Sequence, residues 1–359
     1  MRLLFAAAAL AAIMLSNLPV AIAMETDQYN LPKEPLADIG DEVSAHLEAS
    51  FHSALEKLNA EIALHESCLD GTAAKNVKCK SADKERERLA YLRSNDAIAE
   101  TVYKLHGDGS IFITHIGKWL NSHRFTATPA RYKTSLTDSI FVLKPINYTT
   151  MSPTVKIDGV EFGTDKLDHF FQQGYQYYKI YNKAIAKGAA PDEAVKKAIS
   201  WGKKTERTYF GYWVSGVYSN ADLYANYAGL KFYLSLTKPV PVGDKTRAPL
   251  FTLVDGKWQI ADGITLRADM LAPFITDHMN EALNPSGFNA IVYPVVKRVV
   301  RKQACTKWRA AFPNFTKDDL AARSKSLELW YGEDYGYTRR NKMVTLADTC
   351  FTETTKLGP

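Results

Sequence analysis

The sequence predicts a mainly α-helical protein, a multi-helix bundle into which small β-hairpins are inserted. Over residues 36–66, apolar side chains recur every three to four positions, which is the spacing of a helix that buries one face. Two Asp-Gly dipeptides, each between short segments of alternating polarity, are strong hairpin signals. The hairpins are expected at about 154–162 and 251–260.

Start and stop signals indicate further helices. Pro191 suits the first turn of a helix, where its missing N–H costs nothing, and Asp192 and Glu193 favour a helix N-terminus. Thr316 stands in the position of a helix N-cap. Besides the first, the expected helices cover 81–105, 164–187, 191–217, 219–236, 268–283, 289–311 and the residues after Thr316.

The first 23 residues have the layout of a cleaved secretory signal. Arg2 precedes an apolar run from Leu3 to Leu15, and Ala21-Ile22-Ala23 supplies the small-residue cleavage pattern. A permanent membrane anchor is the weaker alternative, because the apolar run is short and ends close to the helix-breaking Pro19. We therefore expect export to the periplasm or outer envelope, with Met24 as the first mature residue.

Four cysteines fit an oxidising compartment. Of the three ways to pair them, Cys68–Cys79 with Cys305–Cys350 is the local one and the one expected here. A structural zinc site is the rival interpretation, but no Cys-x-x-Cys spacing supports it. The expected regions are a signal peptide (1–23), a stapled helical hairpin (24–106), a central helical region with hairpins (107–288) and a C-terminal region (289–359), or one continuous domain after the signal.

Charge and composition restrict the partners. The 45 Lys and Arg against 39 Asp and Glu give a net charge of +6, which is not a nucleic-acid signature, so no nucleic acid is expected. An exported basic protein is suited to envelope lipids or cell-wall components. The helix at 289–311 places valines beside Lys297, Arg298, Arg301 and Lys302, as a peripheral membrane helix would. An ordinary amphipathic helix packed on the core explains the same pattern.

A set of polar residues is expected to converge in the helices between 164 and 236. Asp165 and His169 are four residues apart on one helix face, and Asp222 and Asn226 repeat this spacing on the third helix. Short connections make successive helices antiparallel neighbours, so Glu206 on the middle helix is expected in the same half of the bundle. Small residues on the third helix would allow close helix approach.

Two chemistries suit an imidazole with several carboxylates. One is a divalent-metal site, the candidate cofactor being unidentified, with Asp165, His169, Glu206 and Asp222 as ligands. The other is acid–base catalysis, in which His169, Glu206 and Asp222 act and Asn226 positions them. Neither a G-x-S-x-G motif, a P-loop nor a G-x-G-x-x-G motif occurs.

Structural explanations stand beside these chemistries. Ser219 and Asp222 have the spacing of a capping box, and Asp165 could serve as an N-terminal cap. Glu206 follows Lys203 by three residues, which suits a surface ion pair. Lys166 is expected to point away from the site and receives no role. A second candidate metal group, Asp277 with His278 and Glu281, is also explained by an ordinary helix end.

The stretch 163–233 resembles VanZ-like proteins, and its first helix is also similar to one in small bacterial envelope lipoproteins. The shared pattern is DK-x-x-HF, then Glu, then S-x-x-D-L-x-A-N-x-x-G. VanZ-like proteins embed these helices in the membrane and are linked to glycopeptide resistance, but the resemblance implies no particular reaction. Here the helices carry many lysines and are expected to face water. The matching positions are Asp165, Lys166, His169, Phe170, Glu206, Ser219, Asp222, Asn226 and Gly229.

The sequence supports two functions. One is a metal-dependent or acid–base hydrolase that acts on an envelope component. The alternative is a non-enzymatic periplasmic binding or scaffolding protein in which the same residues form a buried polar network. The discriminating observation is whether the polar residues meet, and whether they meet in an open cleft or sealed from solvent.

Overall fold

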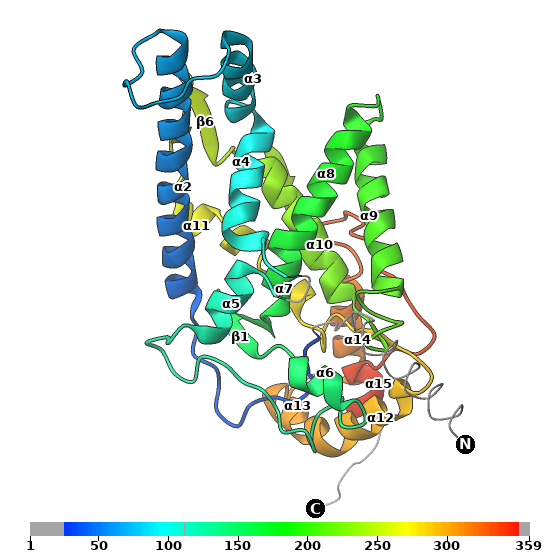
Figure 1. Cartoon of the computed structure of the whole chain (residues 1–359). Coiled ribbons are helices and arrows are strands. Elements are labelled where there is room, and N and C mark those ends of the chain that lie inside the picture. Colours follow the sequence, from blue (N-terminus) through cyan, green and yellow to red (C-terminus); the bar gives the residue numbers. More distant parts are fainter. Residues whose placement is uncertain (1–24, 111–112, 352–359) are drawn as a thin grey trace, which may run out of the picture.

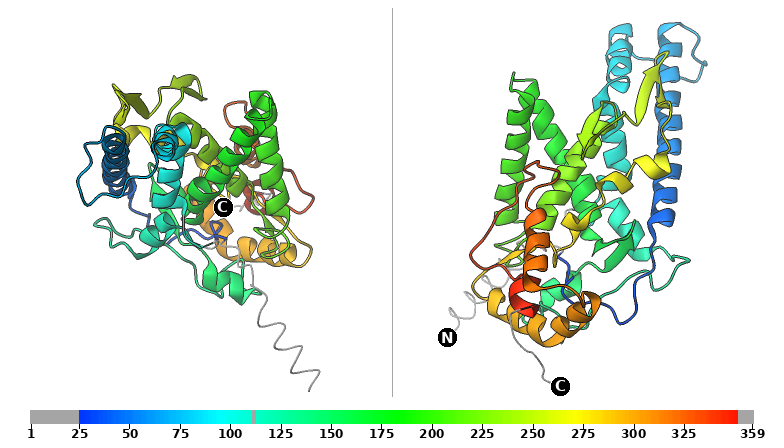
Figure 2. Two further views of the ribbon diagram at one scale, coloured as in Figure 1. Left: turned by 45° about the horizontal axis from the view of Figure 1, so that its top comes forward. Right: turned by 180° about the vertical axis from the view of Figure 1, so that it is seen from behind.

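The computed structural model describes residues 25–110 and 113–351, and in this part the chain is mainly helical with four two-stranded antiparallel sheets. The predicted fold class is therefore confirmed. Figure 1 shows two groups of helices that rise from a common base, with α2, α3 and α4 on one side and α8 and α9 on the other. The view from behind in Figure 2 shows the same division. The expected secretory signal over 1–23 lies outside the described residues.

The N-terminal helices follow the predicted hairpin. The long helix α2 (Gly40–Leu69) packs against α3 (Ala82–Leu92), and the Cys68–Cys79 disulfide ties the end of α2 to the segment before α3. The predicted helix over 81–105 is interrupted, because the Ser94 side chain accepts a hydrogen bond from the Ala97 N–H and so starts a new helix. The elements after this break are α4 (Asn95–Val102), the π-helix η1 (Tyr103–Gly107), α5 (His115–Ser122) and α6 (Pro145–Thr150).

The central helices carry the candidate site, and one of them is shorter than predicted. Helix α9 (Pro191–Arg207) starts at the predicted proline but ends ten residues before 217. The chain then turns back onto the helix end, so closely that a Cβ at Gly211 would overlap the Glu206 carboxylate. The other central elements are α7 (Asp165–Asp168), the π-helix η2 (His169–Gln173), α8 (Gly174–Ile185) and α10 (Asn220–Ser235).

Both predicted hairpins are present. Their turn residues Asp158 and Asp255 have positive φ, each followed by a glycine with positive φ, as two-residue hairpin turns require. A third hairpin around Gly243 was not predicted. The paired strands are β1 (Thr154–Ile157) with β2 (Val160–Gly163), β3 (Val217–Tyr218) with β8 (Gly287–Phe288), β4 (Val240–Val242) with β5 (Lys245–Arg247), and β6 (Phe251–Val254) with β7 (Lys257–Ile260).

The predicted helix at 268–283 is wrong. Pro273 lacks the N–H that a continuous helix needs, and the Asn280 side chain accepts the backbone N–H groups of Ala282 and Leu283. The segment instead forms short turns: α11 (Leu266–Asp269), η3 (Ala272–Phe274) and η4 (Asp277–Met279).

The C-terminal elements agree better with the sequence. The predicted 289–311 helix is divided by a π-helix, and Thr316 forms the predicted N-cap as part of a capping box. The Cys305–Cys350 disulfide is present. No helix of the described residues is long and apolar enough to cross a membrane. The elements are α12 (Val292–Val299), η5 (Val300–Ala304), α13 (Cys305–Ala311), α14 (Lys317–Ser326) and α15 (Leu346–Cys350).

The segment 25–30 contains no helix, and it is buried along its whole length. The Glu25 carbonyl accepts the Ser152 N–H, and the Tyr29 hydroxyl donates to the Val344 carbonyl. The polar N-terminal segment is therefore an interior element that joins residues more than 300 positions apart.

Helix α10 crosses the η2–α8 segment at close range, as the small residues of α10 predicted. A Cβ at Gly229 would overlap the Phe170 carbonyl oxygen and lie 2.8 Å from the Gly174 Cα. The backbones can therefore touch only because both positions lack a side chain.

Replacement of Gly229 by Ala is expected to destabilise the protein by roughly 1–3 kcal/mol, because the added methyl group forces the two segments apart. Urea denaturation followed by circular dichroism would measure the change. Ser200→Ala, at an exposed position of α9, is the control and should change stability by less than about 0.5 kcal/mol. Equal losses in both variants would contradict the close-crossing explanation.

Candidate functional site

The centre of the polar cluster is the ammonium group of Lys166, which is completely buried. Its Nζ atom lies 2.6 Å from Asp165 Oδ2, 2.5 Å from Asp222 Oδ1 and 2.5 Å from Glu281 Oε1. These three carboxylates are at most 2% exposed. They hold the pKa of Lys166 well above its usual value, although burial acts in the opposite direction. Lys166 is therefore a buried cation whose charge is compensated by the three carboxyl groups around it.

The expectation that Lys166 points away from the site is wrong. In a regular helix, adjacent residues project about 100° apart, so Asp165 and Lys166 should not share a face. Here α7 has only four residues and passes directly into a π-helix, and the long lysine side chain reaches the Asp165 carboxylate beside it.

His169 is the one residue of the cluster with a partly exposed side chain, at 14%. Its Nε2 atom lies 3.2 Å from Asp222 Oδ2, and its Nδ1 atom lies 3.0 Å from Asn226 Oδ1. Both ring nitrogens of His169 are therefore engaged by oxygen atoms of the protein. The predicted grouping of His169, Asp222 and Asn226 is observed, and their atoms are in direct contact.

Glu206 is 1% exposed, which excludes a surface ion pair with Lys203. Its Oε1 atom accepts the Ser219 N–H at 2.7 Å, while the Ser219 hydroxyl accepts the Asp222 N–H at 3.1 Å. Ser219 is therefore the predicted N-cap of α10. The Asp222 carboxylate does not complete a capping box, because it faces Lys166 and His169 instead, and Glu206 binds the N-cap backbone in its place.

Glu25 extends the acidic cluster from a segment where sequence reasoning found no site. It is completely buried, and neither carboxylate oxygen has a hydrogen-bond partner among the described residues. Burial, and then the charges of Glu281 and Asp222, raise the pKa of Glu25 well above its usual value. Gln28, three residues on, accepts the Glu281 N–H at 2.7 Å. The buried N-terminal segment is therefore part of the site.

Carboxylate oxygens of Asp165, Asp222 and Glu281 lie within 4.8 Å of one another, which is compatible with a shared metal ion. The Lys166 ammonium, however, lies within 2.6 Å of an oxygen of each carboxylate. A metal ion at their centre would have to displace it. Of the four predicted ligands, Asp165 and Asp222 belong to this group. Of its three carboxylates His169 contacts only that of Asp222, and Glu206 accepts the Ser219 backbone N–H.

The second candidate metal group is not brought together. The His278 ring contacts the Thr276 hydroxyl and the Leu329 carbonyl, and Asp277 pairs with Arg323. Only Glu281 turns into the central cluster, where it accepts hydrogen bonds from Lys166 and from the Ser219 hydroxyl. The sequence pattern placed Glu281 in the wrong group because it predicted a helix over 268–283.

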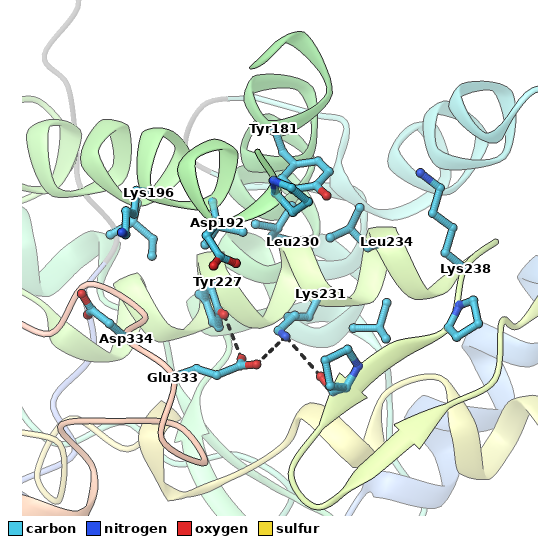
Figure 3. A pocket seen from close by; sticks show the side chains of 16 residues that line it. Tyr181, Asp192, Lys196, Tyr227, Leu230, Lys231, Leu234, Lys238, Glu333 and Asp334 are labelled. Atoms are coloured by element: carbon cyan, nitrogen blue, oxygen red, sulfur yellow. Dashed lines mark hydrogen bonds and ion pairs between the residues drawn. The ribbon is translucent and has the colours of Figure 1, made fainter. Parts of the chain in front are cut away.

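A groove of about 480 Å³ lies beside the later turns of α10, between α8, α9 and the loop that contains Glu333 (Figure 3). Lys231 pairs with Glu333 at 2.7 Å and donates to the Pro241 carbonyl at 3.2 Å, while the Tyr227 hydroxyl donates to the other Glu333 oxygen. The apolar lining residues are Tyr181, Pro191, Val195, Ile199, Tyr227, Leu230, Leu234, Pro239, Val240 and Pro241.

Comparison with known proteins gives no relative: no family model, curated protein or solved structure matches the chain. The resemblance to VanZ-like proteins therefore stays a prediction from its motif. Seven of the nine motif positions nevertheless have a physical role together, since they form the polar cluster and the cap of α10. They are Asp165, Lys166, His169, Glu206, Ser219, Asp222 and Asn226.

Replacement of Lys166 by Met should destabilise the fold by about 3–5 kcal/mol, because three buried carboxylates lose their shared cation. Chemical denaturation would measure this loss. Lys197→Met, at an exposed position of α9, is the matched control and should change stability by less than about 0.5 kcal/mol. If Lys166→Met were as stable as the control, the central role of the ammonium would be wrong.

Stability should fall as pH rises from about 5 to about 8. Burial raises the pKa of Glu281 and of Asp168 to about 7, and raises that of Glu25 and Glu206 well above the usual value. A carboxyl group whose pKa is higher in the folded state stabilises that state at low pH, and its contribution is lost as pH rises through the folded-state pKa.

Glu25→Gln should flatten this pH dependence and increase stability at pH 8, because the amide keeps the shape of the side chain without a buried charge. Thermal unfolding across the pH range would measure both effects. Glu87→Gln, on the exposed face of α3, is the control and should leave the curve unchanged. A Glu25→Gln protein with the parental pH dependence would contradict the assignment.

Proposed function

We propose that this chain is an exported, non-enzymatic binding protein of a bacterial-type cell envelope, in which the polar cluster is a structural frame. The observation that carries the proposal is that both ring nitrogens of His169 already face protein oxygens, at 3.2 and 3.0 Å. A structural frame needs burial and partners within the protein: the three carboxylates around Lys166 are buried and each contacts its ammonium, although the second Asp165 oxygen has no hydrogen-bond partner among the described residues.

A hydrolase places stronger demands on the same residues. A general base needs a nitrogen or carboxylate that can take a proton from water or substrate, and a metal ligand needs a free lone pair. The Asp222 carboxylate contacts the His169 ring, and the carboxylates of Asp165 and Asp222 both contact the Lys166 ammonium. The geometry therefore gives the hydrolase hypothesis less support than the binding hypothesis.

The proposed cellular location is supported by the leader pattern of the sequence and by the two disulfides. The leader pattern at 1–23 is typical of secreted chains, and two disulfides are consistent with an oxidising compartment outside the cytoplasm. The motif shared with envelope proteins points to the same location. All four cysteines are consumed by the disulfides, which leaves no free thiol for metal binding.

The groove beside α10 is the proposed ligand site. Its volume of about 480 Å³ lies in the range of about 300–1,000 Å³ that is usual for small-molecule pockets. Three lysines and three acidic residues line it, so the charges balance: Lys196, Lys231, Lys238, Asp192, Glu333 and Asp334. A net-neutral ligand with an apolar body fits this combination of apolar lining residues and balanced charges.

Nile red, a neutral apolar dye, is a suitable probe of the groove, and its fluorescence should rise on binding to the purified protein. Val195→Glu, in the groove wall, should weaken binding at least about tenfold, because the ligand would meet an uncompensated charge. Leu253→Glu, at an exposed apolar position of β6, is the control and should bind the dye normally.

Two results would oppose the proposal. Equal dye binding by both variants would show that the groove is not the ligand site. A hydrolytic activity on envelope material that disappears in a folded His169→Gln protein would support the enzymatic alternative instead.

A further inference from the structure

Helices α6 and α12 lie at the base of the molecule (Figure 1), and four large apolar side chains on or beside them and on the segment after α9 are exposed. Trp213 is 74% exposed, Ile291 77%, Leu143 64% and Ile146 58%. Single exposed apolar residues are normal on a protein surface, but several on one continuous surface mark an interaction site. The sequence analysis singled out none of these four residues.

Hydrogen bonds hold the three segments that carry these residues together. The Lys144 ammonium donates to the Val214 carbonyl at 3.2 Å and to the Ser215 carbonyl at 2.9 Å. The Asn147 amide donates to the Ser215 carbonyl, and the Asn289 N–H donates to the Gly216 carbonyl. Residues 139–152, 207–218 and 286–304 therefore form one continuous surface, which we call the basal face.

All charged residues of the basal face are basic. Its three segments contain six Lys and Arg residues and no Asp or Glu, in a chain that as a whole has 45 basic and 39 acidic residues. Arg207, Arg298, Arg301 and Lys302 are exposed. Meanwhile Val295, Val296 and Val299 of α12 are buried in the core, as the ordinary amphipathic interpretation of this helix expected. The helix thus packs inward and presents only its basic side outward.

We infer that the basal face docks the protein on the surface of an anionic phospholipid membrane. This inference rests on the proposed envelope location and adds a partner to it. Apolar tips that include a tryptophan suit the interfacial region of a bilayer, where the ring is amphipathic and its surroundings are partly wet. The surrounding arginines and lysines suit acidic headgroups. Docking is peripheral, through side chains on irregular segments and the outer side of α12.

The charge pattern favours a membrane over a protein partner. A protein interface of this chemistry would need an acidic partner with pockets for four separate apolar tips. A lipid surface accepts scattered tips without pockets, because its headgroup region is fluid, and it offers a negative charge over the whole area. The apolar tips and the basic residues can then act together.

The test is co-sedimentation of the mature chain with vesicles of equal parts phosphatidylglycerol and phosphatidylcholine, compared with vesicles of phosphatidylcholine alone. The protein should bind the anionic vesicles, and salt should weaken the binding. Arg298→Gln/Arg301→Gln/Lys302→Gln should bind roughly 100-fold more weakly, and Trp213→Ala about tenfold more weakly.

The matched control, Lys183→Gln/Lys187→Gln/Lys197→Gln, removes the same charge from exposed positions of α8, α9 and their connection and should bind as the parent does. Absence of binding to anionic vesicles, or an equal loss in both triple variants, would overturn the inference. Nile red binding separates this result from the groove proposal, since basal-face variants should leave it unchanged. Circular dichroism of each variant checks that it is folded.

Discussion

The buried ammonium of Lys166 is the constraint on which the rest of the structure depends. Transfer of a lysine from water to a protein interior costs several kcal/mol, and only well-placed partners offset this cost. Here the partners come from three places: Asp165 from α7, Asp222 from α10 and Glu281 from an irregular turn. The fold is therefore compatible with a charged Lys166 only when segments up to 115 residues apart have all assembled.

The same cluster carries more acid than base. Five buried carboxyl groups face two basic side chains, Lys166 and His169. Burial, and then the charges of neighbouring carboxylates, raise the pKa values of Glu25, Glu206 and Glu281. Asp222 is the exception, because both cations contact it and lower its pKa although burial opposes them. The excess of negative charge is therefore reduced by protonation of Glu25, Glu206 and Glu281, whose pKa values are raised. The stability of the fold is consequently sensitive to pH through these buried carboxyl groups.

Helix periodicity predicted the parts of the site that lie in regular helices, and failed where the backbone is irregular. Asp222 and Asn226 were grouped correctly because their spacing of four places them on one face of the regular helix α10. His169, at the start of the π-helix η2, was grouped with them because neighbouring antiparallel helices bring it to the same end of the bundle. Lys166 was missed because a four-residue helix that continues as a π-helix does not obey the spacing rule. Glu25 and Glu281 were missed for a related reason, since an extended segment and a turn have no periodicity that would show which side chains point inward. Helix α9 ends at 207 because the chain turns back onto its end. Helix α11 ends at 269, shortly before Pro273. In both cases the apolar pattern of the sequence predicted a longer helix.

Helix α10 connects the frame to the proposed ligand site. Nearly all of its residues are buried, so it packs on all sides and cannot shift without disturbing several neighbours. Its first turns hold Asp222 and Asn226 in the polar network, and its later turns hold Tyr227 and Lys231 at the groove. A rigid helix fixed at one end by buried charges positions the groove residues at the other end with little freedom. Preorganisation of this kind reduces the entropy that a binding site loses on taking up a ligand. The buried charge pairs at one end of α10 and the groove at its other end are therefore held by the same helix.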